Sequence, residues 1–217
     1  MSKIRKTTFL AIALILTAAA RGQAFDNHDF QVWNTDSEEV KLNKHSKLLF
    51  EQEFRWGNNA SEFYYQHYDL GYQYILNKYF SFGGGFRYIK DKKTDKFRDE
   101  SDPYFASFMN YELFGWKLAD RVRLEYRYYD YQTSSWRFRN KFDIKFPWKF
   151  TRFQIQPLIS DEIFLPLNGI NLNENRLSAG LAFTLTKNLT GELSYMLRDT
   201  KSTNTGSGLI QMSLRQS

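Results

Sequence analysis

Two small clusters of ionisable residues have the spacing that acid–base or nucleophilic chemistry needs. His67 and Asp69 lie two residues apart, so that on a strand the carboxylate would share a face with the imidazole and could orient it. Glu51 and Glu53 share this spacing, as a carboxylate pair for proton transfer would. Neighbours on one strand face are roughly 7 Å apart, however, which is a long reach for a direct hydrogen bond. We therefore interpret His67 as part of a structural network and both glutamates as ion-pair partners. The sequence assigns no catalytic residue, no metal ligand and no cofactor.

These residues belong to a chain in which charged and apolar side chains alternate. In 121–130 (RVRLEYRYYD), three arginines and a glutamate fall on one face, opposite valine, leucine and two tyrosines. The stretch 135–146 (SWRFRNKFDIKF) repeats the arrangement. A helix would spread these charges around its surface, whereas a β-strand separates them onto two faces. The dominant period of two therefore predicts an all-β fold.

The same alternation recurs along the chain and predicts ten strands. Their expected ranges are 48–56, 62–74, 79–88, 104–114, 121–130, 135–146, 153–164, 174–185, 189–198 and 207–215. An even number of strands places both ends of a barrel on the same side. Residues 30–35 also alternate, and counting them gives an odd number, so we keep twelve strands as the alternative to about ten.

Two kinds of connection alternate between these strands. One kind is short and lies at 76–78, 118–120, 147–149 and 186–188. The other is mostly longer and more polar, and it lies at 57–61, 89–103, 131–134, 165–173 and 199–206. Short turns at one rim and longer loops at the other are typical of antiparallel up-and-down barrels in bacterial outer membranes.

The first residues have the composition of an export signal. Three basic residues precede an uncharged apolar run at 9–20, which is too short to span a bilayer as a helix. We expect residues 1–24 to be removed as a signal peptide and residues 25–217 to form one barrel domain. The chain then keeps 26 basic and 24 acidic residues, which gives no reason to expect a nucleic-acid partner. It has no cysteine, which excludes a disulfide framework and a thiolate metal site.

Period two alone does not tell which face meets solvent, because a soluble lipocalin-like barrel places its apolar face inward. Three features favour the inverted arrangement of a transmembrane barrel. Aromatic residues make up 18% of the chain, and Tyr and Trp lie near strand ends as interfacial girdles require. The strands are about ten residues long, which suffices to cross the hydrocarbon layer at a tilt. The charged face mixes both signs, so its members can pair inside a lumen. We expect an outer-membrane location, with a secreted soluble ligand-binding barrel as the alternative.

Eight short segments follow one another in a fixed order. They are FQVW (30–33), EQEFR (51–55), YDLGYQY (68–74), GGFRY (84–88), RLEYR (123–127), WRFRNK (136–141), DEIF (161–164) and NRLSAGL (175–181). In this order they resemble the uncharacterised bacterial outer-membrane β-barrel proteins that are grouped as a domain of unknown function. The resemblance extends over almost all of the chain after the signal. It implies outer-membrane lipid, lipopolysaccharide and the barrel assembly machinery as partners. It supplies no activity, so no functional residue is carried over from it.

The charges expected to face inward are the most informative set. The predicted lumen charge network consists of Glu51, Glu53, Arg55, Asp69, Arg87, Arg121, Arg123, Glu125, Arg127, Arg137, Arg139, Lys141, Asp143, Glu162 and Arg176. Basic side chains outnumber acidic ones by twelve to eight once Lys145, Arg198, Arg215, Glu112 and Glu192 are added. We interpret the set as salt bridges that fill a narrow structural barrel. The first alternative is a narrow pore that prefers small anionic solutes, and a further alternative is a lipid-modifying barrel enzyme.

Overall fold

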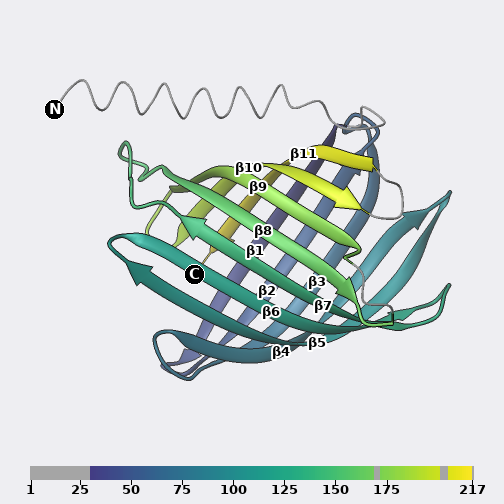
Figure 1. Cartoon of the computed structure of the whole chain (residues 1–217), viewed down its shortest axis with the longest axis horizontal. Coiled ribbons are helices and arrows are strands. Elements are labelled where there is room, and N and C mark those ends of the chain that lie inside the picture. The colour runs from purple at the N-terminus through teal and green to yellow at the C-terminus, as the bar shows by residue number, and fades with distance from the viewer. Residues whose placement is uncertain (1–29, 169–171, 201–204, 217) are drawn as a thin grey trace.

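The computed structural model describes residues 30–168, 172–200 and 205–216, without the side chains of 205–208, and the expected signal peptide lies outside these ranges. The described residues form eleven β-strands that close into one barrel (Figure 1). The strands are β1 (Gln31–Asn43), β2 (Ser46–Gly57), β3 (Glu62–Ile75), β4 (Phe80–Lys93), β5 (Lys96–Leu113), β6 (Trp116–Tyr129), β7 (Ser135–Lys145), β8 (Gln156–Pro166), β9 (Glu174–Thr184), β10 (Leu189–Thr200) and β11 (Thr205–Gln216). Within these ranges, no helix is long and apolar enough to cross a membrane.

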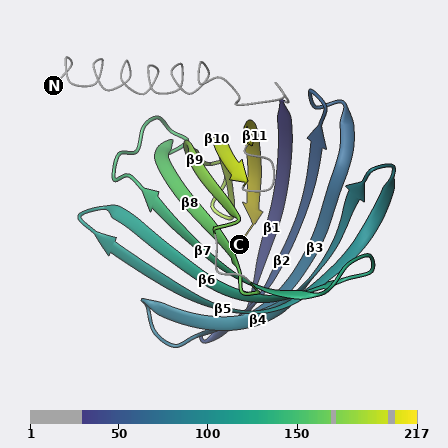
Figure 2. The same cartoon turned by 45° about the vertical axis from the view of Figure 1, so that its right-hand side comes forward.

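Strands that follow one another in the sequence pair antiparallel, and the barrel closes where β1 pairs with β11 in parallel (Figure 2). The seam runs from Gln31 opposite Leu209 to Glu38 opposite Gln216. The prediction of an all-β barrel of about ten strands is confirmed. The count is eleven and the seam is parallel because the alternating segment at 30–35 continues as a full strand, which pairs with β2 from Val32 to Asn43.

An odd number of strands places the start of β1 and the end of β11 at opposite rims. We call one end of the barrel the β4–β5 rim; it carries the start of β1 and the Thr94–Asp95 turn. The other end, the β1–β2 rim, carries the Lys44–His45 turn and the end of β11. The expectation that both ends lie on one side assumed an even count and is wrong.

Three connections also differ from the sequence prediction. The short turn predicted at 118–120 lies inside β6, because the chain already turns at 114–115. The sequence predicts a loop at 89–103, but β4 and β5 continue through it as a hairpin in which Lys93 pairs with Lys96 (Figure 1). Polar side chains occupy both faces of this hairpin, so the alternation that indicates a strand is missing there. On the opposite rim, the connection after β7 is not a short turn: it occupies 146–155 and is bridged by Phe150 and Ile155.

The outward face of the barrel is apolar. Leu70 and Phe105 are 59% and 57% exposed, and similar side chains alternate with the lumen residues along the strands. Aromatic side chains gather near both ends. At the β1–β2 rim, the ring centroid of Phe146 lies 4.8 Å from that of Trp116 and 5.3 Å from that of Trp148. The corresponding cluster at the β4–β5 rim consists of Trp56, Phe63 and Phe97.

Glycines make room for one aromatic side chain against the inner wall. Tyr104 of β5 lies over Gly71 of β3 and Gly85 of β4, and a Cβ atom added to either glycine would lie 2.8 or 2.5 Å from the Tyr104 hydroxyl. This hydroxyl donates a hydrogen bond of 2.6 Å to Oδ1 of Asp69. The two glycines therefore let the tyrosine lie close to the sheet and reach a charged residue of the lumen.

Candidate functional site

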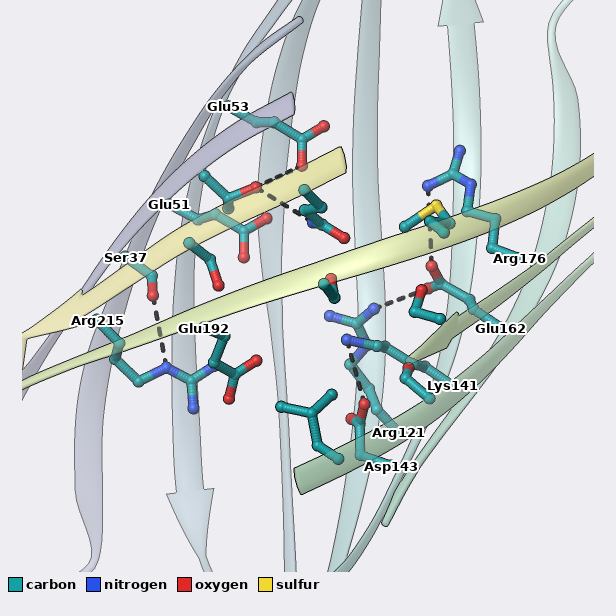
Figure 3. A pocket seen from close by; sticks show the side chains of 18 of the residues that line it. Ser37, Glu51, Glu53, Arg121, Lys141, Asp143, Glu162, Arg176, Glu192 and Arg215 are labelled. Carbon is teal, nitrogen blue, oxygen red and sulfur yellow. Dashed lines mark hydrogen bonds and ion pairs between the residues drawn. The ribbon is translucent and has the colours of Figure 1, made fainter. Parts of the chain in front are cut away.

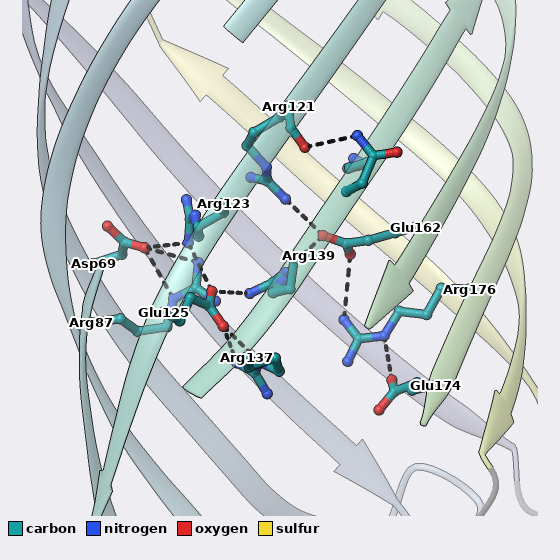
Figure 4. A network of polar contacts seen from close by, with 12 residues as sticks. Asp69, Arg87, Arg121, Arg123, Glu125, Arg137, Arg139, Glu162, Glu174 and Arg176 are labelled. Carbon is teal, nitrogen blue, oxygen red and sulfur yellow. Dashed lines mark hydrogen bonds and ion pairs between the residues drawn. The ribbon is translucent and has the colours of Figure 1, made fainter. Parts of the chain in front are cut away.

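The structure places all fifteen residues of the predicted charge network on the lumen side of the wall. They come from β2, β3, β4, β6, β7, β8 and β9, and Figure 4 shows the central part of the set. Eight of them expose less than a tenth of their surface. Because a buried charge is costly unless an opposite charge or several hydrogen bonds compensate it, the partners of each group decide what the network does.

Asp69 of β3 joins three other strands. Its Oδ2 atom lies 2.8 Å from Nη2 of Arg87 on β4 and 3.2 Å from Nη1 of Arg123 on β6. Its Oδ1 atom accepts the hydrogen bond from Tyr104 on β5. Since β4 and β5 lie between β3 and β6 in the sheet, the Arg123–Asp69 pair spans two strands along the inner face of the wall.

Glu125 of β6 is 1% exposed and holds three arginines. Nη1 of Arg139 lies 2.8 Å from its Oε1 atom, and Nε of Arg137 donates to its Oε2 atom at 2.6 Å. Arg123 approaches the same carboxylate at 3.7 Å. Planar guanidinium groups can share one carboxylate in this way because each presents several donors in a fixed fork.

Glu162 of β8 is a second shared carboxylate. Nη2 of Arg121 and Nη2 of Arg139 each lie 2.8 Å from its Oε1 atom, and Arg176 lies 3.8 Å from its Oε2 atom (Figure 4). Arg139 and Arg176 each have a second carboxylate, Glu125 and Glu174 respectively, whereas Arg121 contacts Glu162. Positive charge continues toward the β1–β2 rim through Arg121.

An arginine–aromatic stack fills the lumen near the β4–β5 rim. Trp33 is completely buried, and the guanidinium carbon of Arg55 lies 3.5 Å from the centroid of its ring. The same guanidinium lies 3.9 Å from the ring of Tyr65 and is paired with Glu53 at 2.6 Å. Arg176 reaches the Trp33 ring from β9 at 5.0 Å. Cation–π contacts between such desolvated groups are worth about 2 kcal/mol or more each.

Several members of this packing were not among the residues predicted from the sequence. Glu174 pairs with Arg176 at 2.6 Å and with Arg198 at 2.8 Å, and its position two residues before Arg176 on β9 could have revealed it. Glu100 and Asp102 pair with Arg127 and Arg137, but the sequence placed them in the expected loop at 89–103. The buried rings that the sequence analysis missed are Trp33, Tyr65, Tyr129 and Phe164.

His67 does not contact Asp69, its neighbour in the candidate catalytic pair. Its Nε2 atom lies 3.2 Å from Oε1 of Glu51, its Nδ1 atom lies 3.1 Å from the hydroxyl of Tyr65, and the residue is 2% exposed. Within the described part of the chain, no group of three or more His, Asp and Glu side chains is arranged to hold a metal ion.

The lumen is filled unevenly along its axis. Six of the buried side chains in the half toward the β4–β5 rim are Trp33, Tyr65, Glu125, Tyr129, Phe164 and Leu209, all at most 9% exposed. Toward the β1–β2 rim lie cavities of about 160, 230 and 510 Å³, and Lys141, Asp143 and Arg215 line all three. Figure 3 shows these residues in the cavity of about 160 Å³. We call these adjoining cavities the cup. Lys141 and Asp143 pair with each other at 3.3 Å there and are both partly exposed.

Comparison with known proteins gives a family and no activity. No curated protein and no solved structure matches this chain significantly. The model of the family described as "Protein of unknown function (DUF2490)" matches residues 30–207, which include ten of the eleven strands in full and the start of β11. The chain belongs to this family of proteins of unknown function.

Proposed function

We propose that this protein is an outer-membrane β-barrel with a sealed lumen, which acts as a structural, non-conducting barrel. The observation that carries the proposal is the packing near the β4–β5 rim, where arginines from several strands meet shared carboxylates and a buried tryptophan. Trp33 on β1 meets Arg176 on β9, and Asp69 on β3 meets Arg123 on β6. Each of these contacts spans two intervening strands on the lumen side and occupies space that water would otherwise fill, so the packed groups leave water little room to pass.

The outward face supports the membrane location. In water, the hydration of exposed apolar side chains such as Leu70 and Phe105 would be unfavourable, whereas in a bilayer lipid chains would cover them. The aromatic clusters near both ends correspond to the two interfacial girdles of a membrane barrel. We assign the β1–β2 rim to the periplasm because four of its five connections, at 44–45, 76–79, 114–115 and 185–188, are short, and only the one at 146–155 is longer.

The charge balance favours a sealed barrel over an anion-preferring pore. The sequence suggested twelve basic against eight acidic lumen residues. Glu100, Asp102 and Glu174 also pair with lumen arginines, which raises the acidic count to eleven. The excess from which anion selectivity was inferred therefore nearly disappears. The contacts of His67 likewise favour a structural role over that of a catalytic base.

Cell fractionation tests the location. The protein, expressed with its first 24 residues, is expected in the outer-membrane fraction. After extraction into detergent, it should migrate faster in gel electrophoresis before heating than after heating, because a closed barrel stays compact until it is boiled. Recovery as a soluble periplasmic protein without detergent would contradict the proposal and support the soluble ligand-binding barrel instead.

A further inference from the structure

The two walls of the cup differ in chemistry. Small hydroxyl side chains face it from the five successive strands β8, β9, β10, β11 and β1. Ser160 lies opposite Ser178 in the β8–β9 register, and Thr35 lies opposite Ser213 in the β1–β11 register. The cup is open because these residues are small, whereas Trp33 and Phe164 fill the lumen nearer the other rim.

Positive charge lies beside this wall, on the next two strands of the sheet. Arg121 of β6 and Lys141 and Lys145 of β7 line the cup, and Arg215 adds a further cation from β11, two residues after Ser213 (Figure 3). Arg121 shares its carboxylate, Glu162, with two other arginines, and its Nε atom is buried without a hydrogen-bond partner among the described residues.

Arg215 reaches only the hydroxyl of Ser37, at 3.4 Å, and has no carboxylate within 4.0 Å in the described part of the chain. Asp143 and Glu192 also line the cup and pair with Lys141 and Lys145. Because eight basic residues and five acidic residues line the cavity of about 160 Å³, an excess of positive charge remains there.

We propose that the cup binds a small phosphorylated sugar or polyol that enters from the β1–β2 rim. A phosphate group would lie against Arg121, Lys141 and Arg215, whose guanidinium and ammonium N–H groups have hydrogen-bonding capacity left for its oxygens. The hydroxyls of the ligand would face the serine and threonine wall, where each side-chain hydroxyl can both donate and accept a hydrogen bond. The hydroxyl wall and Arg121 line the cavity of about 160 Å³. Lys141 and Arg215 also line the adjoining cavity of about 510 Å³, which is within the range of small-molecule sites, so a ligand larger than the first cavity could extend into the second.

This inference deepens the proposed function, since the assignment of the β1–β2 rim to the periplasm makes the ligand a periplasmic one. The binding itself does not depend on that assignment, because it is measured on the folded barrel in detergent. A barrel that fractionates with the outer membrane but binds nothing would refute the inference and leave the proposed function intact.

Isothermal titration of the purified full chain in detergent micelles tests the site. Glucose 6-phosphate is expected to bind, inorganic phosphate to bind at least tenfold more weakly, and glucose to give no measurable heat. The combined Lys141→Gln and Arg215→Gln variant should lose at least tenfold in affinity for glucose 6-phosphate. The matched control is Lys92→Gln, because Lys92 pairs with Glu62 near the other rim, away from the cup, and its affinity should be unchanged.

Steric filling provides a second variant that keeps every charge. Ser178→Leu should abolish binding while the barrel stays heat-modifiable, since the added side chain would project into the cup. Three results would overturn the proposal. They are no binding of glucose 6-phosphate to the folded barrel, equal affinity for glucose 6-phosphate and inorganic phosphate, or the same loss of affinity for glucose 6-phosphate in Lys92→Gln as in the combined Lys141→Gln and Arg215→Gln variant.

Discussion

At the scale of single residues, Glu125 shows what the network contributes to stability. Its carboxylate compensates Arg137 and Arg139 directly and approaches Arg123, so the Glu125→Gln change would leave buried guanidinium charges without a counterion. We expect a loss of about 3–5 kcal/mol in the free energy of unfolding, measured by urea titration in lipid vesicles. Glu62→Gln removes a partly exposed pair with Lys92, which solvent screens, and should cost far less than Glu125→Gln. Equal losses in the two variants would show that the buried network does not stabilise the barrel.

The sequence predicts which residues of the network face inward but not which ones pair. Alternation alone places Glu125 and Arg139 on the charged face, because a strand sends successive side chains to opposite sides. The pairing of Asp69 with Arg123 depends on strand number, tilt and register, which determine the side chains that meet on the inner face of a barrel. Trp33 was missed for a related reason: its segment was left outside the ten predicted strands, although it forms the centre of the arginine–aromatic stack.

At the scale of strands, the contact between Tyr104 and the two glycines can be tested by a double-mutant cycle. A Cβ atom at Gly71 would lie 2.8 Å from the Tyr104 hydroxyl, and its next neighbour would be 3.7 Å away. Gly71→Ala should therefore destabilise the barrel by about 1–3 kcal/mol through overpacking. In a Tyr104→Phe background the clashing oxygen is absent, so the same change should cost at least about 1 kcal/mol less. Identical costs in both backgrounds would mean that the hydroxyl does not lie over Gly71.

Strand prediction succeeded for most segments with one apolar face, although it began β6 five residues late, and it failed where neither face is apolar. The boundaries of β3, β7 and β9 agree with the predicted ranges within one residue at each end. In contrast, the hairpin around Thr94 carries lysine and aspartate on both faces, and its strands are held by backbone pairing that hydrophobic periodicity does not report. A strand that extends beyond the lipid layer is in water on both faces, so both faces can be polar. The missing alternation at this hairpin is therefore consistent with the proposed location.

At the scale of the whole molecule, the odd strand count makes a prediction about orientation. With the β1–β2 rim in the periplasm, the start of β1 and the Thr94–Asp95 turn both lie at the cell surface. An epitope inserted in the Thr94–Asp95 turn, or directly before Gln31, should be labelled by antibody on intact cells. The same epitope in the Lys44–His45 turn should be labelled only after the outer membrane is permeabilised. The reverse pattern would invert the barrel and make the cup face outward.

The sealed lumen is tested most directly by current recording in planar lipid bilayers. The wild-type barrel, inserted at a protein concentration that gives dense incorporation, is expected to show no discrete conductance steps. The combined Trp33→Ala and Phe164→Ala variant removes two buried rings from the half toward the β4–β5 rim and should produce small conductance steps. This variant is the positive control, because its steps would show that the recording detects an opened barrel. Discrete steps from the wild-type protein, of the same size as those of this variant, would contradict the sealed lumen and restore the narrow pore as the function of the barrel.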